Sequence, residues 1–116
     1  MPNTTKYLFN GQKHGKGRLA LAVVREYVEQ HRDAGFAEIR DIFPDKLQQE
    51  RSSQFSSDGQ CVVKRREEVN DYKRFHMKAE DQLVCNGEIL VVSREWNVIN
   101  MENFLTKARD LGFVIK

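Results

Sequence analysis

Hydrophobic positions along the chain divide it into helical and extended segments. In residues 18–31 the apolar positions include Leu19, Val24 and Val28 among others, and part of the run has the three- and four-residue spacing of a buried helical stripe. Residues 36–43 repeat that spacing, and Pro44 ends the second segment because a residue before proline is disfavoured in the α region. The pattern therefore predicts two helices joined by a short turn at residues 32–35.

The second half of the chain predicts a small antiparallel sheet followed by a helix. Residues 82–84 and 88–92 are apolar runs on either side of Asn86-Gly87, a pair that accepts the positive φ angles of a type I′ hairpin turn. Residues 74–77 alternate like a strand, and residues 6–9 form a short strand closed by a turn at Asn10-Gly11. A last helix is expected from an N-cap at Asn100 to residue 111, with Gly112 after it and a strand at residues 113–115.

Length and composition favour one soluble domain. A chain of 116 residues with 40% hydrophobic and 31% charged residues is typical of a single globular α+β domain, here residues 1–116. The polar, serine-rich stretch at residues 48–60 is expected to be a loop. No apolar run is long enough to cross a membrane or to form a signal peptide before Lys6, so we expect a cytoplasmic protein.

Charge is unevenly distributed although the net charge is only +2. Residues 1–25 carry five basic and no acidic side chains, residues 26–50 carry seven acidic and three basic ones, and residues 51–78 are again mostly basic. A basic face of this kind is what a polyanion partner needs, while an evenly solvated mixed surface is the alternative. The residues predicted to contact DNA phosphates are Lys13, Lys16, Arg18, Lys64, Arg65, Arg66 and Arg74.

Glycines before the first helix suggest a weak phosphate site. Residues 11–17 differ from a phosphate-binding P-loop in their glycine spacing, and Gly17 stands where the magnesium-binding hydroxyl residue would follow Lys16. The surviving hypothesis is that backbone amides at the helix N-terminus, with nearby lysines, hold a nucleic-acid phosphate. The alternative is a turn eased by glycine, with its lysines in solvent.

The sequence contains no recognisable pattern of a catalytic or metal-binding site. A nuclease core of the PD-(D/E)xK kind needs a carboxylate two residues before its lysine, and Val62 stands at that place before Lys64. Cys61 and Cys85 have no histidine at ligand spacing, so buried thiols are favoured over zinc or a disulfide. Trp96 is expected in the core rather than stacked on a base. We expect no enzyme activity, no metal and no cofactor.

The order of helix, turn, short helix ending in proline and later hairpin resembles a winged-helix module. The sequence segments at residues 15–24, 36–44 and 95–105 are also similar to a small bacterial module of unknown function. That module is loosely associated with restriction and other DNA-defence proteins. This resemblance covers nearly the whole chain and implies winged-helix-like helices packed on a small antiparallel sheet, with an additional C-terminal helix. It also implies a noncatalytic DNA-binding role, in which residues 46–57 would approach bases if any do. The alternative is a protein-interaction or homodimerisation module that uses exposed strand edges or the acidic segment at residues 26–50.

Overall fold

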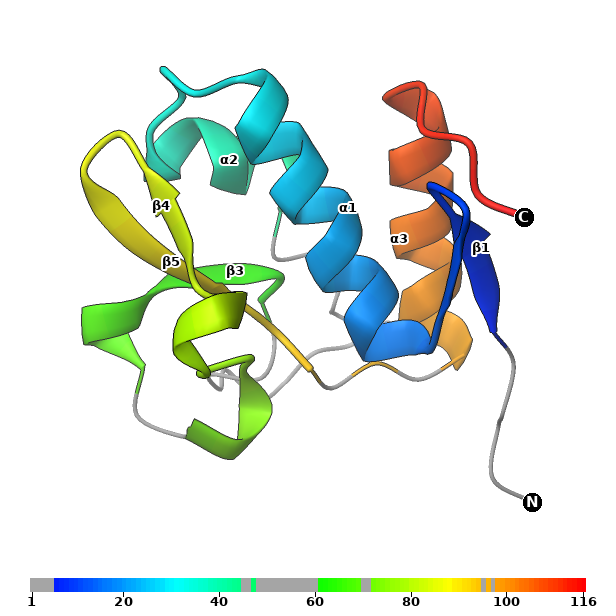
Figure 1. Cartoon of the computed structure of the whole chain (residues 1–116), viewed down its shortest axis with the longest axis horizontal. Coiled ribbons are helices and arrows are strands. Elements are labelled where there is room, and N and C mark those ends of the chain that lie inside the picture. Colours follow the sequence, from blue (N-terminus) through cyan, green and yellow to red (C-terminus); the bar gives the residue numbers. More distant parts are fainter. Residues whose placement is uncertain (1–5, 45–46, 48–60, 70–71, 95, 97) are drawn as a thin grey trace.

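The computed structural model describes residues 6–44, 47, 61–69, 72–94, 96 and 98–116, which form helices and short antiparallel strands (Figure 1). Helices are α1 (Lys16–Gln30), α2 (Phe36–Ile42) and α3 (Val98–Asp110). Strands are β1 (Tyr7–Phe9), β2 (Gln12–His14), β3 (Val63–Arg65), β4 (Leu83–Cys85) and β5 (Glu88–Val92). Three 3-10 turns separate β3 from β4, namely η2 (Arg66–Glu68), η3 (Tyr72–Arg74) and η4 (Ala79–Asp81).

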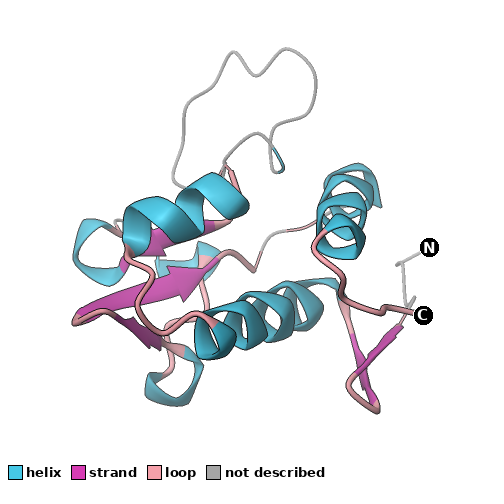
Figure 2. Cartoon of the chain, turned by 90° about the horizontal axis from the view of Figure 1, so that it is seen from above, coloured by secondary structure: helices cyan, strands magenta, loops and turns pink. Residues whose placement is uncertain are grey.

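Helix α1 is the central element of the core. Its buried side chains are Leu19, Ala20, Leu21, Val23, Val24 and Val28, so most of its circumference in the first three turns is covered. Figure 2 shows α1 between the β3–β5–β4 sheet on one side and the β1–β2 hairpin on the other. The helix predicted at residues 18–31 is thus confirmed, and it starts two residues earlier than expected because Gly17 continues the helix rather than breaking it.

Strand β5 lies between β3 and β4 and is covered on both faces. Leu90 and Val92 belong to the main core, which the helices close, whereas Val91 belongs to a second apolar cluster on the opposite face. That second cluster also holds Cys61, Val69 and Phe75. Val69 and Phe75, from the segment between β3 and β4, therefore cover part of this second face of the sheet, together with Cys61.

Both hairpin turns have the backbone geometry that their Asn-Gly pairs allow. Asn86 and Gly87 have φ angles of 51° and 82°, and Asn10 and Gly11 have φ angles of 51° and 79°. Two successive positive φ angles define the type I′ turn, whose twist matches that of the flanking strands. The hairpin predicted at residues 82–92 is confirmed, and the turn after residues 6–9 leads into a second strand, β2, that the polar residues there did not indicate.

Aromatic rings join α3 to the rest of the core. Phe104 is fully buried, stacks on Phe43 at a centroid distance of 5.8 Å and meets Trp96 edge-on at 5.1 Å. The Trp96 indole N–H donates a hydrogen bond to the Ser93 carbonyl oxygen over 2.9 Å. Trp96 is therefore a core residue, as the sequence predicted.

Three predicted local features are wrong. Helix α3 begins at Val98, so Asn100 is a buried residue inside the helix and not its N-cap. Residues 113–115 are not a strand, because after Gly112 (φ 97°) one backbone hydrogen bond, from Lys116 N–H to the Leu8 carbonyl, joins this segment to β1. Residues 74–77 pair with the sheet only through a single bridge, Phe75 with Ser93.

The α+β class and the small antiparallel sheet are confirmed. The predicted loop at residues 48–60 lies outside the described residues, as does the predicted base-reading segment 46–57 except for Leu47, which is buried. Within the described part of the chain, no helix has the length and apolar character needed to span a membrane.

We predict that Phe104→Ala lowers the free energy of unfolding by about 3–5 kcal/mol, because it leaves a cavity between Phe43 and Trp96. Urea denaturation followed by circular dichroism measures this loss. Val114→Ala is the control, since Val114 is 69% exposed and its truncation should change stability by no more than about 0.5 kcal/mol. Equal effects of the two substitutions would contradict the packing described for α3.

Candidate nucleic-acid interface

Basic residues from separate parts of the chain meet at the first turn of α1. Lys16 and Arg18 lie on this turn. The Lys6 Nζ atom lies beside Gly15, only 3.5 Å from the position that a Cβ atom on Gly15 would occupy. The Arg94 backbone packs against Gly17, with its carbonyl oxygen 3.0 Å from the position of a Cβ atom there. Residues far apart in the sequence therefore meet at one helix end, where the Lys6 ammonium and the Arg94 backbone lie beside the turn that carries Lys16 and Arg18.

The same turn presents backbone donors. The first helical hydrogen bond runs from Leu19 N–H to the Gly15 carbonyl over 2.8 Å, so the amides of residues 16–18 precede the helical ladder. Gly15 at the N-cap has no side chain to accept from these amides, and the first turn contains no acidic residue. The positive end of the helix dipole and the surrounding cations together favour a bound anion at this end of α1.

Close packing fixes the first turn of α1 to the segment after β5. The His76 ring donates from Nε2 to the Gly17 carbonyl oxygen over 2.9 Å. Arg94 N–H donates to the Arg74 carbonyl oxygen over 2.8 Å, which brings the backbone of residue 74 alongside residue 94. Since the Arg94 backbone leaves almost no room for a Cβ atom at residue 17, glycine is the residue that permits this contact.

His76 is buried in this junction as a neutral imidazole. Burial lowers the pKa of His76, the hydrogen bond to the Gly17 carbonyl opposes that change, and the positive charge of Arg18 lowers the pKa further. Asp81 raises and Arg94 lowers the pKa by smaller amounts, and the net pKa lies below the ordinary value of 6.5. Donation from Nε2 to a carbonyl oxygen agrees with the neutral form that carries its proton on Nε2.

Asp81 holds two arginines of α1 in place. Arg18 Nη1 lies 2.9 Å from one Asp81 carboxylate oxygen, and Arg25 Nη2 lies 3.9 Å from the other. Burial raises the pKa of the Asp81 carboxyl, but the hydrogen bond and charge of Arg18, with smaller contributions from His76 and Arg25, bring the pKa below its usual value. The Asp81 side chain is 5% exposed whereas that of Arg18 is 55% exposed, so Arg18 is anchored at one nitrogen and still faces solvent.

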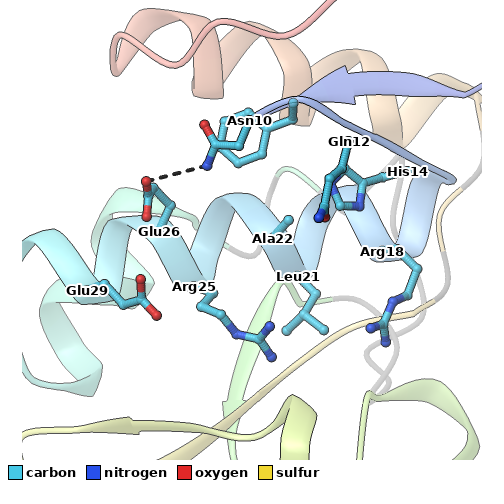
Figure 3. A pocket seen from close by; sticks show the side chains of 10 residues that line it. Asn10, Gln12, His14, Arg18, Leu21, Ala22, Arg25, Glu26 and Glu29 are labelled. Atoms are coloured by element: carbon cyan, nitrogen blue, oxygen red, sulfur yellow. Dashed lines mark hydrogen bonds between the residues drawn. The ribbon is translucent and has the colours of Figure 1, made fainter.

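A shallow hollow of about 270 Å³ runs along the exposed side of α1 (Figure 3). Asn10, Gln12 and His14 come from the β1–β2 hairpin, and Arg18 and Arg25 lie along the helix. Glu26 and Glu29 line the end of the hollow that is farther from the helix N-terminus, and Asn10 reaches Glu26 at 3.5 Å. The charge along the hollow thus changes from basic near the first turn of α1 to acidic toward its last turns.

The seven residues predicted to contact phosphates fall into two groups. Lys13 is exposed on β2, two residues before the N-cap of α1, and Lys16 and Arg18 lie on the first turn itself. Arg74 is connected to this group through Arg94, whose N–H donates to the Arg74 carbonyl oxygen. Lys64 and Arg65 lie on β3 and Arg66 begins η2. Along β3, Val63 pairs with Val92, at the end of β5 that leads to Arg94, and Arg65 pairs with Leu90 in the middle of β5. The second group therefore extends away from Arg94 and from the first turn of α1.

Arg65 has partners within the protein. Its guanidinium donates to the Glu88 carboxylate, lies 3.9 Å from Glu68 and stands over the Phe36 ring at 4.5 Å from the ring centre. These contacts join β3 to the hairpin and to α2. Arg65 therefore has a structural role that the basic run at residues 64–66 did not reveal.

Lys6 and Arg94 complete the cluster at α1 although they were not among the seven predicted residues. In the sequence, Lys6 was only one of the five basic residues in the N-terminal segment 1–25. Arg94 is an isolated basic residue after the hairpin. No local sequence signal links either residue to α1, because their proximity depends on how β1 and β5 pack against the helix.

Other candidate chemistry is not assembled in the described residues. Among them, no group of three or more His, Cys, Asp and Glu side chains is arranged to hold a metal ion. Cys61 and Cys85 are buried and not joined in a disulfide, and the Cys85 thiol donates to the Ala34 carbonyl oxygen. Burial, with Glu88 and Glu38 nearby, raises the pKa of the Cys85 thiol, which disfavours a reactive thiolate.

Comparison with known proteins gives no further assignment: no protein-family model, curated protein or solved structure matches this chain.

We predict that the free energy of unfolding falls as pH drops below about 6.5, because the unfolded chain binds a proton on His76 more readily than the folded one. His76→Gln keeps a donor for the Gly17 carbonyl but does not titrate, so its stability should depend less on pH in this range. Urea denaturation between pH 5 and 8, an interval of about three units around the histidine pKa, measures the difference. An identical pH dependence in wild type and His76→Gln would contradict this account of the junction.

Proposed function

We propose that this protein is a noncatalytic, cytoplasmic DNA-binding module that contacts the phosphate backbone through the first turn of α1. The observation that carries the proposal is that Lys16, Arg18, the Lys6 Nζ atom and the Arg94 backbone meet at a helix N-terminus that has no acidic residue in its first turn. Cations placed at the positive end of a helix dipole repel that dipole, and the Asp81 carboxylate bound to Arg18 offsets only part of this repulsion. A phosphate group would relieve that repulsion and accept hydrogen bonds from the amides of residues 16–18, which precede the helical hydrogen-bond ladder.

Glycine and backbone packing make this end of the helix suitable for an extended polyanion. Gly15 and Gly17 add no side chain around the amides, so a phosphate can approach the backbone closely. Asp81 holds Arg18 at one nitrogen, which leaves its other donors oriented toward solvent at little further cost in side-chain entropy. Lys13 on the neighbouring strand extends the basic surface beyond a single phosphate.

Phosphate contacts position a protein on a duplex but do not read its sequence. The described residues that support the proposal are of this backbone-contacting kind. We therefore propose duplex binding with little sequence preference by this face, and any base reading by residues 46–57 remains part of the winged-helix hypothesis. The proposed role of Lys64 and Arg66 is secondary, on a surface that continues from β3 into η2.

We predict that the double variant Lys16→Gln/Arg94→Gln binds a random-sequence duplex more weakly than wild type and with a shallower salt dependence. Each phosphate contact contributes about 0.9 to the slope of log affinity against log salt, so losing two should reduce the slope by about 1.8. Fluorescence anisotropy with a labelled duplex across a salt series measures both quantities.

The matched control is Lys107→Gln/Lys116→Gln, which removes the same net charge from the last turn of α3 and the C-terminal residue. It should retain nearly the wild-type slope. Equal losses in both double variants would mean that binding depends only on net charge, and no binding by wild type at low salt would refute the proposal.

A further inference from the structure

An exposed apolar pair lies on the β4–β5 hairpin. Val84 is 72% exposed and Ile89 is 45% exposed, and the two are direct cross-strand partners. Their side chains point away from the main core, which takes Leu83, Cys85 and Leu90 from the opposite face of the hairpin. Cross-strand apolar pairs stabilise a sheet when a neighbouring surface covers them, and within the described structure these two side chains face solvent.

At the outer edge of β4, the Val84 backbone has no backbone partner among the described residues, whereas Gln82 N–H donates to the Lys78 carbonyl oxygen over 3.1 Å. In a hairpin with a two-residue turn, Cys85 and Glu88 form the hydrogen-bonded pair next to the turn, so Val84 and Ile89 form a non-hydrogen-bonded pair. The Val84 N–H and C=O therefore point away from β5. Protected edges usually carry a lysine, a proline or a bulge, whereas the outward positions here are Gln82, Val84 and Asn86.

Space for another strand exists beside this edge. A hollow of about 370 Å³ separates β4 from the C-terminal half of α1. Its floor includes Val28 and Leu83, and its α1 rim carries Arg25, Glu29 and Arg32. This rim has charges of both signs. If two copies of the chain met symmetrically at this edge, their rims would therefore not form a cluster of like charges.

We propose that β4 pairs antiparallel with β4 of a second copy of this chain, so that two three-stranded sheets join into one. A two-fold axis at Val84 places it opposite Val84 of the second copy, where the two residues exchange both backbone hydrogen bonds. The exposed pair Val84 and Ile89 then forms a continuous apolar row across four strands with the same pair of the second copy. In that register Gln82 faces Asn86 of the second copy, and no like charges meet along the strand.

A second copy fits this edge better than a flexible peptide does. The edge strand has only three residues, so the hydrogen bonds that it offers are few. A disordered peptide loses conformational entropy on pairing, whereas the edge of a second copy is already held in strand geometry by its own hairpin. An interface of this size is at the small end for specific dimers, and we expect a dissociation constant on the order of micromolar. This proposal does not depend on nucleic-acid binding.

The test is sedimentation equilibrium of the protein without nucleic acid, over concentrations from about 1 μM to 1 mM that bracket the expected dissociation constant. Wild type should change from monomer to dimer across this range. Val84→Lys should remain monomeric, because it places two like charges opposite each other at the axis and leaves the monomer intact at a 72% exposed position. Val114→Lys, at a 69% exposed position beside β1, should dimerise like wild type.

A monomeric wild type at the highest concentration would overturn the proposal, as would equal behaviour of the two lysine variants. A second measurement tests the register. Val84→Cys should form a disulfide-linked dimer on mild oxidation, because residues opposite each other in a hydrogen-bonded pair have Cα atoms about 5.5 Å apart. Val114→Cys is the control for random collision, and equal cross-linking of both variants would overturn the pairing at Val84.

Discussion

The contact between the first turn of α1 and the backbone after β5 is the constraint on which the rest of the structure depends. Gly17 allows the Arg94 backbone to lie against the helix, and the His76 imidazole holds the Gly17 carbonyl from the same side. This contact sets the position of α1 on the sheet, and the large apolar side chains of α1 then close the main core. It also explains why the pKa of His76 is lowered, since the contact buries the imidazole, and the positive charges of Arg18 and Arg94 lower the pKa further.

The basic surface follows from that packing and not from a basic run in the sequence. Lys16 and Arg18 belong to the helix, the Arg94 backbone is brought to it by β5, and Lys6 is brought to it by β1, which begins at the next residue. Asp81 is the acidic residue that partly offsets this cluster, and it is buried beneath Arg18 where it orders the guanidinium. The Asp81 carboxylate is thus buried in the junction, while the Arg18 side chain that it binds stays 55% exposed to solvent.

The elements that the sequence predicted well are those specified by local chemistry. The apolar stripe of α1, the proline after α2 and the Asn-Gly turn of the β4–β5 hairpin each determine a structure within a few residues. The wrong predictions concern segments whose secondary structure depends on contacts with residues far away in the sequence. Asn100 looked like an N-cap, yet α3 begins two residues earlier and buries it, and β2 is a polar strand that exists because it pairs with β1 and packs on α1.

The candidate site shows the same division. Lys16 and Arg18 could be predicted because they flank glycines before a helix, but Arg94 and Lys6 reach the helix only through tertiary packing. Arg65 was predicted as a phosphate contact from its neighbours Lys64 and Arg66, and the structure gives it two carboxylate partners and an aromatic ring. A run of basic residues in the sequence does not show which of their side chains already pair with carboxylates or aromatic rings within the protein.

The central claim, that the first turn of α1 contacts nucleic-acid phosphates, is tested most directly by a titration followed by NMR. Backbone amide resonances of the labelled protein would be recorded while an unlabelled duplex is added at low salt. The account predicts that the largest shifts occur at residues 16–18 and at Arg94, and that they reverse when salt is raised. Shifts confined to residues 64–66 or to the β4 edge, with the first turn of α1 unchanged, would contradict it.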